Sequence, residues 1–305
     1  MNNRNGKSGT VIILFWIIVV FNVLWFGSML IKNNSDSEEK ENQPAGVKDS
    51  NELDCFYYNQ LSPEDQHAYE ILLEGLKNRE ESIILNHCAS ASTEAVWDAV
   101  LKEHPEIFWT NAYQYLEYKE EPYCDVRPDY CYTRDEIKDR QSQMEEIVSD
   151  FLKGASGCDT DYDKIRYTYE YMIRQTDYNL QAENNQHIDS VLIGKESVCA
   201  GYARTTKYLL NQLGIPCMYL NGEAKKENEN PESHAWNIVL CENDTYFVDT
   251  TWGDPVYLNP DGSEAEQGDN INYDYLCCNE EFLFQTHTPN PNYTYPSCTK
   301  ENIEQ

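Results

Sequence analysis

The spacing of apolar residues in the first half of the chain predicts helices, and each has a capping residue in front of it. Ser62–Asp65 offers an N-cap with proline at the first helical position, which predicts a helix to about Arg79. Ser92 or Thr93 begins a second helix, which must end before the His104-Pro105 pair because proline restricts the residue before it.

Two further helices are predicted from capping boxes. Thr133 is followed three residues later by an acidic residue and begins a long helix that closes at Gly154. Thr160 begins the next helix with the same chemistry. The segment from residue 55 to about 155 is therefore expected to be largely helical.

A fifth helix is predicted farther along, with Ser197 as its N-cap and Gly214 just past its end. This assignment places Cys199 in the first helical turn, where the helix dipole and free backbone N–H groups favour a thiolate. The apolar positions that define this helix are Ala203, Tyr208, Leu209 and Leu213.

Two strands follow this helix. His234–Leu240 alternates so that every second side chain lies on one face, and Tyr246–Asp249 is the next apolar run. Glu242–Asp244 between them indicates a turn. Helices in the first half followed by a helix and strands in the second predict an α+β protein.

The register of these two strands decides whether His234 meets Asp249. If Cys241 opposes Tyr246, then Ile238 opposes Asp249, so that His234 and Asp249 share a face. They would still be four residues apart along the strand direction, and contact would require a bulge or an offset register. A slip of one residue would turn Asp249 to the other face.

The N-terminus contains 21 uncharged residues, Val11–Ile31, which at about 1.5 Å per residue are long enough to span a bilayer as a helix. No small-x-small cleavage site follows, so we expect an uncleaved signal anchor, with secretion after cleavage as the alternative. Arg4 and Lys7 precede the segment and acids dominate after it, which predicts a cytoplasmic N-terminus and an extracellular domain. The polar, acidic residues 32–54 are typical of a flexible stalk.

The net charge of −30 argues against nucleic acid as a partner, because phosphate binding requires a basic surface. The chain has eleven cysteines, and ten of them could form disulfides if Cys199 stays free. We expect Cys124, Cys131 and Cys298 to be bridged, and Cys217 to be a small buried residue at the start of a strand. No Cys-x-x-Cys pair occurs and the acidic residues 259–270 lack calcium-loop spacing, so neither a metal nor another cofactor is expected.

Three short motifs carry the chemistry. They are Cys199-Ala-Gly-Tyr-Ala, then His234-Ala-Trp-Asn, then Asp249-Thr-Thr-Trp. A thiol, an imidazole and a carboxylate are the parts of an activated nucleophile, in which the histidine moves a proton and the acid orients the histidine.

These motifs resemble the catalytic core of the transglutaminase-like superfamily over about residues 178–255. The resemblance covers Cys199–Ala203, Leu213–Pro216, His234–Val239 and Asp249–Trp252 in the order typical of the family. The segments at 104–109 and 176–179 are less specifically similar to secreted or membrane-anchored bacterial members. The resemblance implies a papain-like fold, in which a nucleophile helix packs on an antiparallel sheet.

By the same resemblance, Cys199 would be the nucleophile, His234 the general base and acid, and Asp249 the orienting acid. The backbone N–H of Cys199 would be one donor to an oxyanion. The family takes a second donor from an upstream side chain, and Tyr178 and Gln186 are the candidates. Each of these residues could instead have a purely structural role.

The tryptophans of the second and third motifs have two interpretations. Trp236 and Trp252 flank two of the motif residues and could wall a substrate channel, although tryptophan in a strand more often packs in a core.

Three functions are compatible with these residues. The first is cell-surface acyl transfer, in which Cys199 attacks a glutamine amide of a protein or peptide and an amine resolves the thioester. The second is a cysteine peptidase or amidase acting on protein or cell-wall peptide, with water as the acceptor. The third is a non-catalytic scaffold, which the presence of all three motif residues disfavours.

The expected organisation combines these elements along the chain. It comprises a cytoplasmic N-terminus (1–10), a transmembrane signal anchor (11–31), an acidic stalk (32–54), a helical subdomain (55–158), a transglutaminase-like catalytic core (159–290) and a polar tail (291–305). The expected partners are a protein or peptide substrate at the cell surface and the membrane itself.

Overall fold

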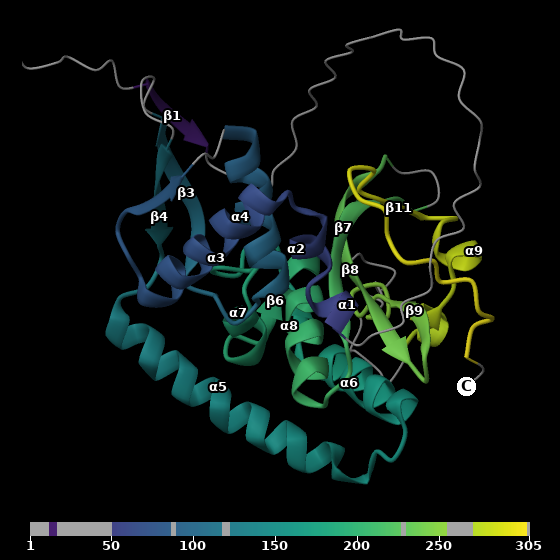
Figure 1. Cartoon of the computed structure of the whole chain (residues 1–305). Helices are drawn as coiled ribbons and strands as arrows, with labels where there is room; N and C mark the ends of the chain where they lie inside the picture. The colour runs from purple at the N-terminus through teal and green to yellow at the C-terminus, as the bar shows by residue number, and fades with distance from the viewer. Residues whose placement is uncertain are drawn as a thin grey trace, which may run out of the picture.

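The computed structural model describes residues 12–16, 51–86, 90–117, 123–226, 230–254 and 271–303. These residues form a mixed arrangement of helices and sheets, as the α+β prediction requires. Figure 1 shows the two larger sheets at opposite sides of the molecule, with the helices α3 and α4 beside one and α8 beside the other; β5 and β6 form a third, two-stranded sheet.

The larger sheet is antiparallel and contains five strands in the order β10-β9-β8-β7-β11. Helix α8 packs against β7 and β8, and α6 packs against α8. The bounds are α6 Asp161–Gln175, α8 Cys199–Gln212, β7 Cys217–Ala224, β8 Glu232–Cys241, β9 Asp244–Val248, β10 Leu276–Cys278 and β11 His287–Pro289. A helix on an antiparallel sheet is the core that the sequence predicts.

The second sheet has the strand order β1-β3-β4-β2, and its strands β2, β3 and β4 lie in the segment that the sequence predicts to be largely helical. That prediction is therefore wrong for β2 to β4, because strands with a tyrosine-rich, poorly alternating pattern give no clear period-2 signal. The bounds are β1 Ile12–Trp16, α3 Pro63–Asn78, β2 Ile83–Asn86, α4 Ser90–Glu103, β3 Thr110–Glu117, β4 Tyr123–Tyr130 and α5 Arg134–Gly154.

Short elements connect these layers. They are α1 Asn51–Asp54, α2 Phe56–Gln60, β5 Asp177–Tyr178, α7 Ile188–Leu192, β6 Glu196–Ser197, α9 Glu280–Leu283 and the 3-10 turns at Ala155–Gly157 and Tyr273–Tyr275. One continuous apolar core runs from Leu72 and Trp97 on the side of the smaller sheet to Trp236 and Leu283 on the other side.

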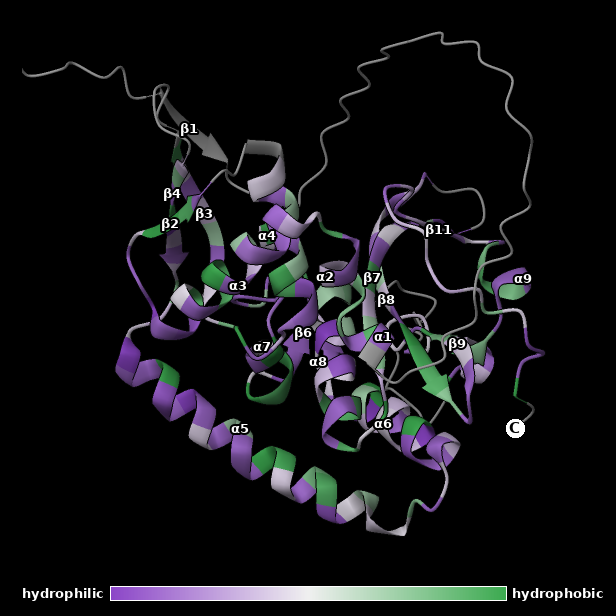
Figure 2. Cartoon of the chain, in the orientation of Figure 1, coloured by the Kyte–Doolittle hydropathy of each residue, from purple (hydrophilic) through white to green (hydrophobic). Residues whose placement is uncertain are grey.

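The capping predictions are confirmed at three helices. The Ser62 hydroxyl accepts from the Asp65 backbone N–H, and both Thr133 and Thr160 form complete capping boxes. The helix predicted from Ser92 or Thr93 begins slightly earlier, at Ser90. Figure 2 shows hydrophobic residues interspersed along the otherwise hydrophilic α5, as expected for a helix with one face on the protein.

The turn between β8 and β9 corrects the predicted register. Cys241 pairs with Asp244 rather than with Tyr246, and the two residues between them, Glu242 and Asn243, both have positive φ. Such a tight two-residue turn lengthens both strands and shifts the pairing by two residues. Because the shift is even, each side chain keeps its face while Asp249 moves closer to His234.

The N-terminal segment differs from its prediction where it is described. Residues Ile12–Trp16 form β1, antiparallel to β3, instead of the first turns of a membrane helix, and Ile, Phe and Trp favour strands. Among the described residues, no helix has both the length and the apolar character that crossing a bilayer requires. Residue 11, residues 17–31 and most of the predicted stalk lie outside the described residues, so the anchor stays a prediction.

The cysteine predictions have mixed outcomes. Cys217 is fully buried at the start of β7, as predicted. The expected bridges at Cys131 and Cys298 are wrong, because both residues have free thiols: Cys131 lies against the Phe108 carbonyl and Cys298 is buried in the apolar core. Cys124 is buried beside the Thr93 hydroxyl.

Candidate active site

Cys199 is the first residue of α8 and is partly exposed. The N-cap is Val198, which has no capping side chain, so the predicted Ser197 cap is wrong. The Ser197 hydroxyl instead donates to the Asn185 carbonyl and lies 2.8 Å from the Ser190 hydroxyl. The first backbone N–H groups of a helix have no intrahelical partner, so this N-terminus keeps donors beside the thiol.

Gly201 allows the loop before the helix to approach it closely. A Cβ at this position would collide with the Ser197 hydroxyl and lie 2.8 Å from the Asn185 carbonyl oxygen. Glycine in this motif therefore serves packing around the helix start, and a larger residue would displace the segment that leads into Cys199.

Asn237 ties the helix to the sheet. Its buried amide nitrogen donates to the carbonyl of Ala203 in α8, at 2.9 Å, and to that of Met218 in β7, at 3.2 Å. The Asn237 side chain thus fixes the height of α8 over β7 and β8, and with it the position of Cys199 relative to His234.

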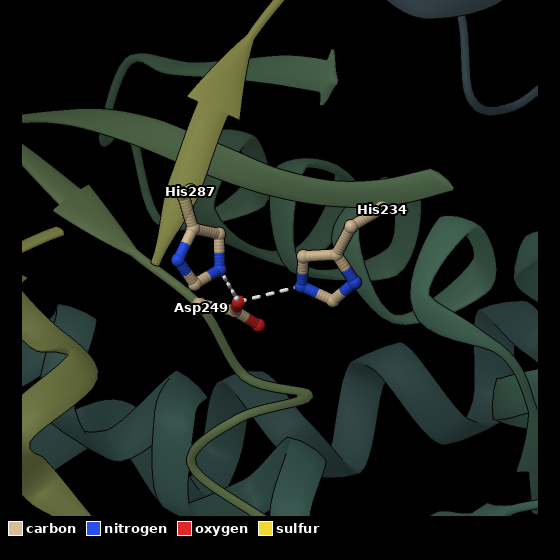
Figure 3. A group of neighbouring side chains, drawn as sticks. All are labelled: His234, Asp249 and His287. Atoms are coloured by element: carbon tan, nitrogen blue, oxygen red, sulfur yellow. Dashed lines mark hydrogen bonds and ion pairs between the residues drawn. The ribbon is translucent and has the colours of Figure 1, made fainter. Parts of the chain in front are cut away.

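His234 and Asp249 are in direct contact. His234 lies in β8, Asp249 follows the last residue of β9, and His234 Nε2 is 2.7 Å from Asp249 Oδ2 (Figure 3). This contact leaves Nδ1 as the ring nitrogen that can reach Cys199, whose thiol is within hydrogen-bonding reach of His234. The three predicted residues therefore form a chain from thiol to imidazole to carboxylate.

Asp249 is buried and accepts hydrogen bonds at both carboxylate oxygens. Its Oδ1 accepts from the backbone N–H groups of Thr251 and Trp252, at 2.9 and 3.0 Å. Its Oδ2 accepts from His234 and from a second imidazole, that of His287 in β11, at 3.0 Å (Figure 3). Such partners stabilise the ionised form of a buried carboxylate.

The electrostatics of this cluster favour an imidazolium. Burial by itself lowers the pKa of His234, but the charge and hydrogen bond of Asp249, together with Cys199, outweigh it and raise the pKa to about 10. Burial raises the pKa of Asp249, whereas the two histidines more than offset that effect and hold it well below the ordinary value. At neutral pH, the pair is therefore an imidazolium and a carboxylate.

Tyr178 lies against Cys199. Its hydroxyl is within hydrogen-bonding reach of both the backbone N–H and the thiol of Cys199, although 40% of the residue is exposed. Burial of the hydroxyl end, together with Cys199, holds the pKa of Tyr178 well above its ordinary value, so the phenol stays a neutral donor. Gln186, the other candidate, contributes its backbone carbonyl, which accepts from Arg204 Nη1 at 2.9 Å.

The two tryptophans pack around the histidines. Trp236 is buried and stacks on His234 at 5.9 Å and 20°. Trp252 is partly exposed and lies 4.6 Å from the His287 ring. Trp236 thus belongs to the core, as its position in a strand suggested, whereas Trp252 covers the histidines from outside.

His287 was not among the residues predicted from the sequence. It stands in a short strand 38 residues after Asp249, outside the motif region, and no spacing pattern links it to the other residues. Its pairing with β7, in which His287 opposes Ala224, brings it to Asp249. Such a contact depends on tertiary structure and leaves no local signal.

His234, Asp249 and His287 are also residue types that bind metals, and one donor atom from each lies within 4.8 Å of the others. The Nε2–Oδ2 distances of 2.7 and 3.0 Å are those of direct hydrogen bonds. A tetrahedral zinc ion between a nitrogen and an oxygen would hold these atoms roughly 3.3 Å apart. The arrangement therefore fits a hydrogen-bonded cluster better than a metal centre.

Comparisons with known proteins find matches to part of the chain. Residues 149–250 match the sequence profile of the Transglutaminase-like superfamily. The Kyphoscoliosis peptidase of Homo sapiens is 25% identical over 159 residues, which cover 48% of this chain and 22% of that protein. The Mus musculus protein of the same name is 25% identical over 125 residues, which cover 37% of this chain and 18% of the mouse protein. The matched part of the chain spans about a fifth of the length of these curated relatives.

Several solved structures show partial likeness to this chain. A protein described as a TGase matches with a TM-score of 0.34 and 13% identity; the match covers 54% of this chain and 48% of the TGase chain. The periplasmic domain of TgpA from Pseudomonas aeruginosa matches with a TM-score of 0.29 and 16% identity; the match covers 45% of this chain and 59% of the TgpA chain. The part of the chain that matches the Transglutaminase-like superfamily, residues 149–250, contains Cys199, His234 and Asp249.

Proposed function

We propose that this protein is a cysteine-dependent acyltransferase that acts on glutamine or other amide groups of proteins or peptides. Cys199 is the nucleophile, His234 the proton carrier and Asp249 the residue that orients His234. The observation that carries the proposal is the 2.7 Å contact between His234 Nε2 and Asp249 Oδ2, with the Cys199 thiol within reach of the same imidazole. The match of residues 149–250 to the Transglutaminase-like superfamily adds support.

The first half of the reaction forms a thioester. The Cys199 thiolate attacks the amide carbon, and the oxygen takes up negative charge between the Cys199 backbone N–H and the Tyr178 hydroxyl. The carbon–nitrogen bond then breaks as the His234 imidazolium gives its proton to the departing amine. Since His234 is already protonated at neutral pH, its first task is that of an acid.

The second half returns the enzyme to its starting state. Neutral His234 takes a proton from the incoming amine, which attacks the thioester carbon, and the carbon–sulfur bond breaks to restore the thiolate. Asp249 keeps Nε2–H of His234 engaged throughout, so that Nδ1 faces the reacting atoms in both half-reactions.

Hydrolysis is the second candidate, with water in place of the amine. It is favoured by the partial exposure of Cys199 and the 40% exposure of Tyr178, which leave the thiol near solvent. The human and mouse relatives are also named as peptidases. An extracellular location remains part of the proposal and rests on the sequence of residues 11–31.

Mass spectrometry of the products separates these functions. The full-length protein and a Cys199→Ala variant are incubated with glutamine-containing peptides and a primary amine. Amine adducts on glutamine that vanish in the variant support transfer, whereas deamidated or cleaved peptides without adducts support hydrolysis. Equal product from both proteins would refute a role for Cys199, and no product from either would favour a binding scaffold.

A further inference from the structure

His287 reaches Asp249 from the edge of the sheet. Strand β11 pairs with β7, and the imidazole of His287 points toward the same carboxylate oxygen that His234 contacts (Figure 3). The residue is 1% exposed. Its position is therefore that of a second, fully enclosed imidazole on the far side of Asp249 from Cys199.

The hydrogen bonds of His287 determine its tautomer. Ionised Asp249 has no hydrogen to give, so His287 Nε2 carries the hydrogen of the 3.0 Å contact. His287 Nδ1 is 2.8 Å from the Thr286 hydroxyl, which then donates to it. The alternative acceptor for this hydroxyl, the Leu283 carbonyl, is farther away at 3.3 Å.

Aromatic rings hold the His287 ring in this orientation. Trp252, Trp236 and Tyr275 lie 4.6, 5.1 and 6.1 Å from it between ring centroids. An apolar side chain would satisfy this packing equally well. What the imidazole adds is the N–H that it donates to Asp249.

We propose that His287 is a positioning residue for this thiol chemistry, because its Nε2–H holds Asp249 in line with His234 and limits how tightly Asp249 retains the His234 proton. This inference rests on the proposed function. It extends the chain of thiol, imidazole and carboxylate by a second imidazole, which touches neither substrate nor thiol.

The physical reason is competition for one oxygen. Asp249 Oδ2 shares its negative charge between two N–H donors. Without His287, the whole charge of that oxygen faces His234, so the imidazolium becomes a weaker acid and gives its proton less readily to the departing amine.

The hydroxyls and the thiol that face Asp249 are neutral at pH 7, because burial raises the pKa of each of them. Cys199 faces His234 from α8. The neutral groups facing Asp249 are Tyr169, Tyr275 and Cys278. The effect of a His287 substitution can therefore be assigned to its hydrogen bond.

The test compares two rates in the full-length protein. One is the turnover of a glutamine peptide with a primary amine, which needs the acid function of His234. The other is alkylation of Cys199 by iodoacetamide at pH 7, followed by peptide mapping with the exposed Cys55 as an internal reference, which needs no acid.

For His287→Leu, we expect kcat to fall about 10- to 100-fold with little change in KM, while the alkylation rate stays within about threefold of wild type. His287→Gln keeps an N–H donor and should recover most of kcat. His104→Leu is the matched control, because His104 makes a 2.8 Å imidazole–carboxylate contact with Glu106 away from the site.

Equal loss of both rates in His287→Leu, or an unchanged kcat, would overturn the inference. Should His287→Leu fail to fold, Thr286→Val removes the hydroxyl that fixes the tautomer of His287. This variant should show a smaller fall in kcat, again with little change in the alkylation rate of Cys199. An unchanged kcat in Thr286→Val counts against the inference. A wild-type Cys199 that alkylates no faster than Cys55 would instead contradict the proposed function.

Discussion

Asp249→Asn tests the electrostatic basis of the site with a minimal change in shape. The amide can still accept from the backbone N–H groups of Thr251 and Trp252 through its oxygen. Its NH₂ group would then face the Nε2–H of His234, donor against donor. The substitution therefore removes the negative charge and the hydrogen bond that favour the imidazolium.

The expected size follows from the pKa of His234. A rise from 6.5 to about 10 corresponds to roughly 5 kcal/mol in favour of the imidazolium. Cys199 supplies part of this, so we expect the loss of Asp249 to cost about 3–4 kcal/mol, within the range for breaking a buried ion pair. With the charge gone, burial should leave His234 neutral at pH 7.

The effect on stability has a defined pH range. The folded pKa of His234 lies above its unfolded value, so its contribution is complete below pH 6.5 and disappears as the pH rises through about 10. The pKa of Asp249 is depressed, so its contribution requires a pH above the ordinary value of 3.8. The difference in unfolding free energy between wild type and variant should be largest between these limits.

NMR titration of protein labelled with ¹⁵N-histidine measures His234 directly, with His234→Gln to assign its signals. We expect a protonated ring at pH 7 in the wild type and a neutral ring in Asp249→Asn. Denaturant unfolding at pH 6 and pH 9.5 should show a larger difference at the lower pH. A His234 that titrates at the same pH in both proteins would refute the reasoning.

Three further predictions concern neighbouring residues. Tyr178→Phe should lower kcat by about 100-fold with KM nearly unchanged in steady-state assays, and an unchanged kcat would exclude an oxyanion role. Gly222→Ala should lower the free energy of unfolding, measured by denaturant titration, by about 1–3 kcal/mol, because the added Cβ would collide with the Thr288 carbonyl in β11. Gly157→Ala is the control: a Cβ there meets open space, so the free energy of unfolding should not change. Burial raises the pKa of Asp254 to about 6, so the folded protein is destabilised by the ionised carboxylate at pH 8 and not at pH 3.5, where the carboxyl is protonated. Asp254→Asn should therefore raise Tm at pH 8 but not at pH 3.5. An equal rise at both pH values would contradict the burial argument.

Local chemistry made the helices predictable. Thr133 and Thr160 fix helix starts through contacts within three residues, which a sequence displays directly. Ser197 looked equally suitable, but its hydroxyl is engaged by Asn185 and Ser190, so the helix begins without a side-chain cap. Tertiary contacts thus overrode a local preference at the start of α8.

The site was predictable only as far as its motifs extend. The types and order of Cys199, His234 and Asp249 were visible in the sequence, whereas the pairing of His234 with Asp249 depends on the tight turn at Glu242. The place of His287 depends on an edge strand far along the chain, so no pattern could include it.

The central claim is that Cys199 forms a covalent thioester with the substrate carbonyl. The most direct test is intact-mass and peptide-mapping spectrometry of the full-length protein, quenched in acid during turnover of a glutamine peptide. The account predicts an adduct equal to the peptide minus ammonia, attached at Cys199, absent from Cys199→Ala and removed on adding a primary amine. Turnover that continues with no adduct at Cys199, or with the adduct at another residue, would contradict it.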